Sequence, residues 1–166
     1  MVLKHGNYVA ESTAIIEPGA VVSSGCYIGH YTLIRAGAVI GKDSEVRAFC
    51  FIAPQVKIGR NVKIMQYSNI GQGTRIANDV YIGAKCMITN TNRIKHGRPF
   101  GLVITPCEIG YAARIASGVT LLPGVCIGDN ALIGAGSLVT KSVPKGEVWM
   151  GHPAKFVREV SVEELL

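Results

Sequence analysis

The sequence predicts an all-β protein built as a parallel β-helix, in which very short strands wind around a prism of buried aliphatic side chains. The first observation is a strict period of six: Ile or Val occupies every sixth position from Ile16 to Ile88, which gives 13 consecutive rungs. The second is a fainter ladder of mostly small residues four positions after the rungs, from Ala20 to Cys86. Neither an α-helix nor strand alternation produces a period of six, whereas a fixed repeat is typical of a stacked solenoid.

The third observation is the turn chemistry between rungs. Glycine follows many of the rungs, and pairs such as Asn78–Asp79 fill the next positions. Because Gly and Asn tolerate positive φ, each six-residue unit can form one short strand and one tight corner. Three corners close a triangle, and coils stacked about 4.8 Å apart would make a prism roughly 30 Å tall. A β-sandwich, with its period of two and irregular spacing, fits this pattern poorly.

We expect one domain over residues 1–166. Residues 1–10 form a lead-in whose Tyr8 and Val9 cover the open end of the core. The β-helix then spans about 10–143.

A C-terminal cap is predicted over 144–166, since a solenoid needs its last repeat covered. The ladder ends at Val143, directly before Pro144. A short amphipathic helix is predicted within the cap from its apolar positions, which are Phe156, Val157, Val160 and Leu165.

The ladder is interrupted once. Rungs resume at Val103, three residues out of phase with Ile88, so a loop of about 89–102 must leave the prism. This loop has no acidic residue, and its basic residues are Arg93, Lys95, His96 and Arg98. A basic loop that projects from a rigid scaffold is a common place for function.

Composition narrows the classes of partner. The formal net charge is +6, but only 7% of residues are aromatic and there is no run of Lys and Arg, which disfavours nucleic acid. The N-terminus lacks an apolar segment of signal-peptide length, and no stretch approaches the roughly 20 apolar residues that span a bilayer. We therefore expect a cytoplasmic protein with neither a nucleic-acid nor a membrane partner.

The cysteines and histidines suggest no metal site. Four of the five cysteines, Cys26, Cys50, Cys86 and Cys107, lie on the small-residue ladder, and no CxxC or Cys/His pattern occurs. We expect them to behave as small buried hydrophobic residues.

The repeated pattern of an aliphatic residue, Gly, two variable residues and a small residue resembles the hexapeptide-repeat acyltransferase family over roughly residues 10–160. The resemblance implies a left-handed parallel β-helix of hexapeptide repeats, a homotrimer, and acyl-CoA bound in a groove between neighbouring subunits. The handedness comes from the resemblance, because crossover connections in sheets are otherwise right-handed.

Residues 133–141 and 151–155 are similar to the end of the acetyl-CoA-using sugar transferases of that family. The similarity implies acetyl-CoA as the acyl donor. It implies that the pantetheine and pyrophosphate of acetyl-CoA lie along four residues: Ser117, Ala135, Thr140 and Lys141. Lys155 and Arg158 would meet the nucleotide phosphates, since cations bind phosphate well. The alternative is that these two residues are ordinary solvated charges.

Residues 80–90 resemble the N-acetyltransferases of nucleotide-linked amino sugars, which carry a Thr-Asn pair just before their loop. The resemblance places Asn90 beside the amine and the thioester, and Thr89, Arg93 and Arg98 against the substrate. An amide is no general base, but it can hold a neutral amine or donate to the oxyanion.

The chain also departs from that group, which usually continues with an acidic residue and Pro-Arg and carries an Asn-Asn step one coil earlier. Here Thr91 follows the pair, Arg98–Pro99 has the opposite order, and Gln66–Tyr67 replaces the Asn-Asn step. Both departures lie where the acceptor would bind.

Sugar O-acetyltransferases of the galactoside and maltose type use a loop histidine as base, and His96 is the nearby candidate. Gamma-class carbonic anhydrases of this fold bind zinc through histidines, two of them five residues apart, and no pair here has that spacing. We therefore expect no metal.

The leading hypothesis is an acetyl-CoA-dependent N-acetyltransferase acting on an amino sugar, nucleotide-linked, in the synthesis of surface polysaccharide or glycan precursors. Two alternatives stay open: a sugar O-acetyltransferase, and a non-catalytic β-helix that serves as a trimerisation scaffold.

Overall fold

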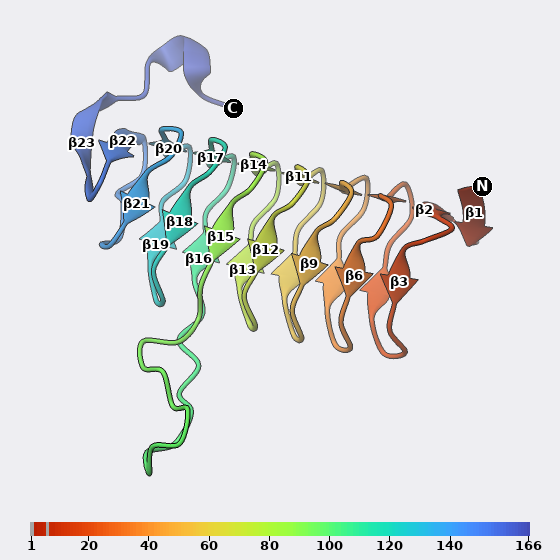
Figure 1. The fold of residues 1–166 in the computed structure, drawn as a ribbon. Coiled ribbons are helices and arrows are strands. Elements are labelled where there is room, and N and C mark those ends of the chain that lie inside the picture. The colour runs from red at the N-terminus through yellow and green to blue at the C-terminus, as the bar shows by residue number, and fades with distance from the viewer. Residues whose placement is uncertain (1, 6) are drawn as a thin grey trace.

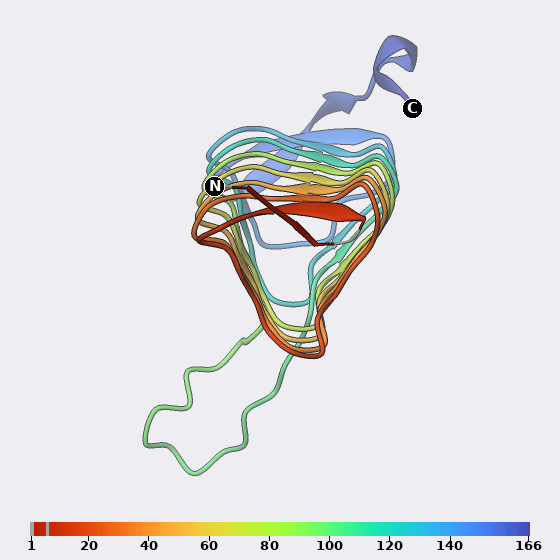
Figure 2. The same cartoon turned by 90° about the vertical axis from the view of Figure 1, so that its right-hand side faces the viewer.

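The computed structural model describes residues 2–5 and 7–166, with side chains from residue 7 onward. It has the predicted fold class, a left-handed parallel β-helix of hexapeptide repeats with one projecting loop. Seen along its axis, the prism has a triangular outline and the loop leaves from one of its corners (Figure 2). Most strands are two residues long, and they stack in three parallel sheets that form the prism walls (Figure 1).

Sheet A contains β1 (Val2–His5), β2 (Tyr8–Glu11), β5 (Tyr27–Ile28), β8 (Glu45–Val46), β11 (Lys63–Ile64), β14 (Tyr81–Ile82), β17 (Arg114–Ile115), β20 (Leu132–Ile133), β22 (Glu147–Gly151) and β23 (Ala154–Glu159). Sheet B contains β3 (Ile15–Ile16), β6 (Leu33–Ile34), β9 (Phe51–Ile52), β12 (Asn69–Ile70), β15 (Met87–Ile88), β18 (Thr120–Leu121) and β21 (Leu138–Val139). Sheet C contains β4 (Val21–Val22), β7 (Val39–Ile40), β10 (Lys57–Ile58), β13 (Arg75–Ile76), β16 (Glu108–Ile109) and β19 (Cys126–Ile127).

The register of the sheets explains the period in the sequence. Ile58 of β10 pairs with Ile76 of β13, one coil or 18 residues further along the chain. Each residue therefore stacks on the residue at the same position of the next coil. The rungs form one buried column for each sheet, and the residues before the rungs form columns that face outward.

The core is made of the rungs and the small-residue ladder. Polar members of that ladder are buried and bonded: the hydroxyl of Thr32 donates to the carbonyl of Arg47 at 2.6 Å, and that of Ser68 donates to Gly83 at 3.0 Å. A buried hydroxyl requires such a partner. Cys26, Cys50 and the other two ladder cysteines are buried and free, as predicted.

The lead-in is a hairpin of β1 and β2 whose second strand joins the edge of sheet A. Tyr8 packs against the core cluster, as expected. Val9 instead pairs with Tyr27, a residue of the outward-facing column of sheet A, so it does not cover the core.

The loop differs from the expectation at its C-terminal side. No strand lies between Ile88 and Glu108, and Val103, predicted as a rung, is 67% exposed. The physical reason is that the chain leaves after sheet B and must next enter sheet C. Residues Glu108–Ile109 occupy that place beside β13, so no unpaired strand position is left for Val103.

The cap also differs. Phe156 and Val157 belong to β23, which pairs antiparallel with β22, and only Val162–Glu164 form a turn of 3-10 helix, η1. The predicted amphipathic helix is therefore wrong for most of its length. β-Branched and aromatic residues favour a strand when an edge such as β22 is free to pair. No helix in the described part of the chain has the length and apolarity needed to cross a membrane.

Candidate functional site

The three corners of the prism are named by the sheets that they join. Corner AB contains the turns between sheets A and B, corner BC those between sheets B and C, and corner CA those that close the coil. Because coils stack in register, each corner position forms a straight column along the prism. A site on this scaffold is therefore located by its corner and its coil.

Thr89 and Asn90 lie at corner BC, directly after β15, where the loop begins. The Thr89 hydroxyl donates to the Leu121 carbonyl at 2.7 Å, so the coil itself uses it. The Asn90 carbonyl accepts from the Thr105 amide at 2.7 Å, which closes the base of the loop.

The side chain of Asn90 is half-buried and lies against Gly71, where an added Cβ would stand 3.2 Å from the Cβ of Asn90. Among the described residues, no hydrogen bond to its amide group is found. The amide is therefore held in place by packing and is available to a ligand.

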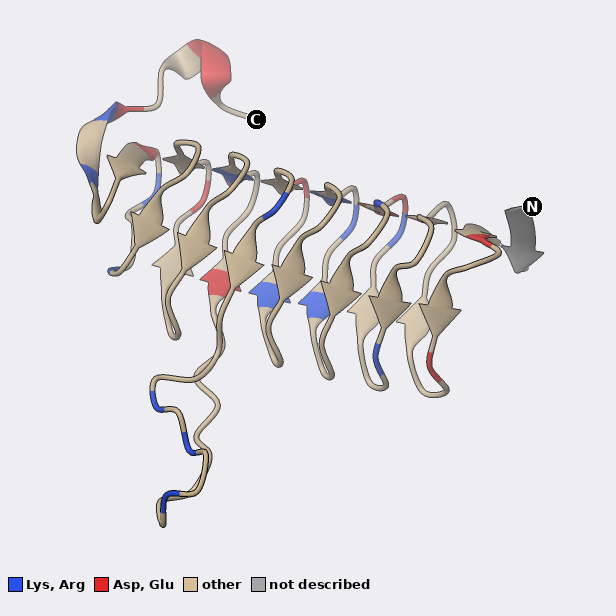
Figure 3. Cartoon of the chain, viewed as in Figure 1, with Lys and Arg blue, Asp and Glu red and all other residues tan. Residues whose placement is uncertain are grey.

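The outer part of the loop is cationic and exposed. The Arg93 guanidinium lies over the Phe100 ring, 3.9 Å from its centroid, and Arg98 donates to the His96 carbonyl at 2.7 Å. The loop points away from its own prism, and its Lys and Arg residues lie along the outer part (Figure 3). Within one chain, the structure therefore does not bring His96, Arg93 and Arg98 onto the prism.

Ser117 and Ala135 lie at corner AB, after β17 and β20. The Ser117 hydroxyl accepts from the Ala84 amide at 3.1 Å. The residue after Ala135 is Gly136, with a φ of +67°, and a Cβ added there would meet nothing within 4 Å. This end of corner AB thus exposes backbone rather than side chains, so a ligand can lie close to the main chain. The Gly118 and Gly136 amides already donate to the carbonyls of Ala84 and Ser117, at 2.8 and 2.9 Å.

Thr140 and Lys141 are exposed but lie at corner BC, after β21. The structure therefore divides these four of the six predicted donor-binding residues between the two corners that flank sheet B. The outer face of sheet B lies between the two pairs.

Lys155 and Arg158 lie on β23. Lys155 is exposed, whereas Arg158 is paired with Glu164 of η1 at 2.8 Å. Hydrogen bonds from Arg158 first, and then from the backbone and side chain of Ser161, lower the pKa of Glu164 to about 2. The bond to Glu164 raises the pKa of Arg158. A phosphate that binds Arg158 must therefore compete with this carboxylate.

Sheet B has the apolar outer face. Its outward column consists of Ile15, Leu33, Phe51, Asn69, Met87, Thr120 and Leu138. In Figure 3 the sheet B strands carry no charge colour, whereas β10, β13 and β16 of sheet C do. Exposed apolar faces of this length are typical of protein contacts.

Two features were not predicted. The first is a column of exposed aromatic residues at corner AB, in the N-terminal coils. Tyr31 and Phe49 have ring centroids 5.1 Å apart, and Phe49 and Tyr67 have centroids 4.9 Å apart with ring planes within 4°. The signal was present in the sequence as aromatics at a spacing of 18, one coil, which the six-residue period obscured.

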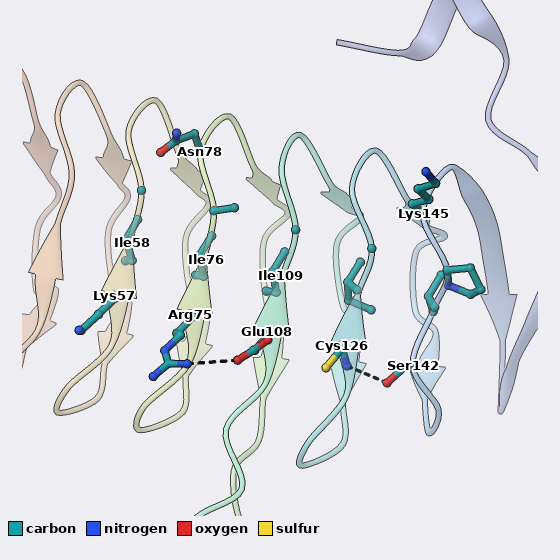
Figure 4. A pocket seen from close by; sticks show the side chains of 17 residues that line it. Lys57, Ile58, Arg75, Ile76, Asn78, Glu108, Ile109, Cys126, Ser142 and Lys145 are labelled. Carbon is teal, nitrogen blue, oxygen red and sulfur yellow. Dashed lines mark hydrogen bonds and ion pairs between the residues drawn. The ribbon is translucent and has the colours of Figure 1, made fainter.

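The second is an open hollow of about 840 Å³ along sheet C, lined on one side by Lys57, Arg75 and Glu108 and ending near Lys145 (Figure 4). Arg75 and Glu108, on the neighbouring strands β13 and β16, pair along this side at 3.3 Å. None of the predicted site residues lines this hollow. Among the described residues, no group of three His, Cys, Asp or Glu side chains could hold a metal ion.

Comparison with known proteins gives a consistent picture. The family described as "Bacterial transferase hexapeptide (six repeats)" matches residues 55–90 and 106–141, so the gap in the match falls on the loop. Galactoside O-acetyltransferase of Escherichia coli is 38% identical over 138 residues, which cover 75% of this chain and 64% of that protein. Mitochondrial gamma carbonic anhydrase 2 of Arabidopsis thaliana is 28% identical over 158 residues, which cover 92% of this chain and 54% of that protein.

This chain thus spans about half to two thirds of the length of these two relatives. Among solved structures, a hexapeptide transferase family protein from Anaplasma phagocytophilum superimposes with a TM-score of 0.55 at 26% identity. That match covers 93% of this chain and 80% of the other.

Proposed function

The chain belongs to the bacterial hexapeptide transferase family, and from this premise we propose that it is an acetyl-CoA-dependent N-acetyltransferase acting on a nucleotide-linked amino sugar. The product would serve the synthesis of surface polysaccharide or another glycan precursor. The observation that carries the proposal is the packed, unbonded amide of Asn90 at the base of the loop. No histidine lies beside it at that point of the chain.

An amine acceptor suits these groups. The neutral amine attacks the thioester carbonyl, a C–N bond forms, and the carbonyl oxygen gains negative charge. The Asn90 amide can donate to that oxyanion or accept from the amine N–H, which are the interactions that stabilise such a transition state. When the C–S bond breaks, the thiolate of CoA can accept the proton that the amine loses, so no protein base is required.

We further propose that the site forms between copies of the chain in a homotrimer. Ser117 and Ala135 of one copy would meet Thr140 and Lys141 of the next, because the two pairs lie at different corners of one prism. The apolar outer face of sheet B, which lies between these corners, supports this arrangement. The projecting loop would then reach the neighbouring prism and bring His96 and the cations to its acceptor.

A cytoplasmic location is part of the proposal. It is supported by the five free cysteines, four of them buried, which are typical of a reducing compartment.

Sugar O-acetylation is the second candidate. It is favoured by the identity of 38% to a galactoside O-acetyltransferase. A hydroxyl acceptor needs a base, and His96 in the exposed loop has a suitable group for that role.

The two candidates are separated by measuring thiol release from acetyl-CoA with a panel of amino sugar nucleotides and of unmodified sugars. We expect turnover with an amine, a loss of about 10²–10³-fold in kcat for Asn90→Ala, and activity within a few-fold of wild type for His96→Ala. Turnover with hydroxyl sugars only, abolished by His96→Ala, would instead establish O-acetylation.

A further inference from the structure

The aromatic column at corner AB occupies a backbone position that does not suit aromatic residues. Tyr31, Phe49 and Tyr67 have φ values of 56°, 60° and 63°, in the left-handed region. Bulky side chains are unusual there, and the corresponding positions of the last coils hold Gly118 and Gly136. Such strain, repeated in three successive coils, points to a use for the rings beyond closing a corner.

The rings do not complete the core. They are 61%, 46% and 55% exposed, in chain order. Phe49 has both ring faces covered by its two neighbours. Tyr67 ends the column, and no other described ring stacks on its second face. That face is directed toward the next coil, in which Lys85 occupies the same corner position.

The chemical groups exposed at corner AB therefore follow one another in a fixed order along the prism. The aromatic column comes first, then the exposed amine of Lys85, then the bare backbone at Gly118 and Gly136. Ser117, expected beside the pantetheine of acetyl-CoA, directly precedes Gly118. A donor and an acceptor that share this corner would thus approach each other from opposite ends.

We propose that Tyr67 is the stacking platform for the nucleobase of the acceptor and that Lys85 binds the diphosphate next to it; this rests on the proposed function. Every base has a π-face that can stack on an aromatic ring. Because the next coil carries Lys85 at the same corner position, a base that stacks on Tyr67 would displace the Lys85 side chain outward, where its amine can meet the phosphates. A cation one coil further along suits the phosphates that follow a base. An aromatic face followed by a cation matches the base and the phosphates of a nucleoside diphosphate better than it matches an unlinked sugar.

The choice of ligand also agrees with the departure of this chain from the resembling enzymes. Gln66–Tyr67 replaces their Asn-Asn step at this coil. An aromatic ring in place of an amide changes this position from hydrogen bonding to stacking. The base, rather than the sugar, is the part of the acceptor that gains from this change.

The test is calorimetric titration of the full-length chain with UDP, dTDP and GDP, and with pyrophosphate as the base-free probe. The main variant is Tyr67→Gly, which removes the ring and suits the left-handed backbone. The matched control is Tyr31→Gly, which makes the same change at the far end of the column. Tyr67→Phe keeps the ring and guards against a folding defect.

We expect at least one nucleoside diphosphate to bind wild type more tightly than pyrophosphate, and Tyr67→Gly to weaken it by roughly 10-fold or more. Tyr31→Gly and Tyr67→Phe should stay within about two-fold of wild type, and pyrophosphate affinity should not change. An unchanged affinity in Tyr67→Gly, or an equal loss in Tyr31→Gly, would overturn the assignment.

The remaining outcomes separate this inference from the proposed function. Acetylation of an unlinked amino sugar without any nucleotide binding would overturn the nucleobase subsite and leave N-acetylation standing. Nucleotide binding that depends on Tyr67, with no acetyl transfer to any amine, would support the nucleobase subsite and overturn N-acetylation. A change of mass by light scattering in Tyr67→Gly would show that a second copy covers the ring, and would also overturn the subsite.

Discussion

Gly71→Ala should damage catalysis more than it damages stability. A Cβ at Gly71 would stand 2.6 Å from the Ile88 carbonyl oxygen, the same atom that accepts the Gly71 amide at 2.9 Å, and 3.2 Å from the Cβ of Asn90. Ordinary contact begins at 3.4 Å, so the Ile88 carbonyl must retreat by about 0.8 Å, from 3.4 minus 2.6. Asn90 follows Ile88 by two residues and should move with it.

The magnitudes follow from this displacement. Forcing one methyl group into a packed site costs about 1–3 kcal/mol, which for a domain of this size lowers Tm by roughly 2–12 °C. A shift of about 1 Å in a catalytic group can lower kcat by roughly 10²-fold. The stability loss is therefore moderate, and the activity loss should be large.

The assay combines differential scanning calorimetry with thiol release at saturating substrates. Gly41→Ala is the matched control, because its Cβ would meet the Gly59 backbone at 2.5 Å at corner CA, away from the loop. Gly101→Ala, where a Cβ meets nothing within 4 Å, should change neither quantity. If Gly71→Ala and Gly41→Ala lose the same Tm and both keep wild-type kcat, Asn90 does not act at the reacting atoms.

Two further predictions concern ionisation and thiol exposure. The pKa of Glu164 is lowered from 4.5 to about 2, so its bond to Arg158 stabilises the fold above about pH 4.5 and is lost as pH falls toward 2. The Tm difference between wild type and Glu164→Gln should shrink over that interval, and a constant difference would show that the pair contributes nothing. Burial raises the pKa of Cys50 and Cys107 to about 11, whereas Cys126 is exposed. Iodoacetamide at pH 8 should therefore give one adduct by intact mass, and Cys126→Ser should give none.

The sequence predicted the repeating part of this fold well because each buried column is a direct consequence of a six-residue period. It predicted the ends of the repeat less well. Val103 has the right phase for a rung, but phase alone does not tell whether a neighbouring strand is free to pair. Phe156 and Val157 fit the apolar pattern of an amphipathic helix, but they form a strand because the edge of β22 is free to pair with them.

The candidate site was predictable only residue by residue. Thr89 and Asn90 stand out because they end the regular ladder. The division of Ser117 and Thr140 between two corners could not be read from either motif, since it depends on which sheet each rung joins. The aromatic column became visible only when residues 18 apart were compared, because that is the spacing at which side chains touch in this fold.

The loop leaves and rejoins the prism at the same corner, with the Thr105 amide bonded to the Asn90 carbonyl. Across it, strand partners are 33 residues apart, as in Arg75 and Glu108, yet they keep the register of the uninterrupted coils. The stacking of the coils on either side of the loop therefore does not depend on the length of the loop. Loops of other lengths and chemistries can therefore be exchanged at corner BC while the prism walls stay the same. Under the proposed function, acceptor specificity could then change without any change in the core.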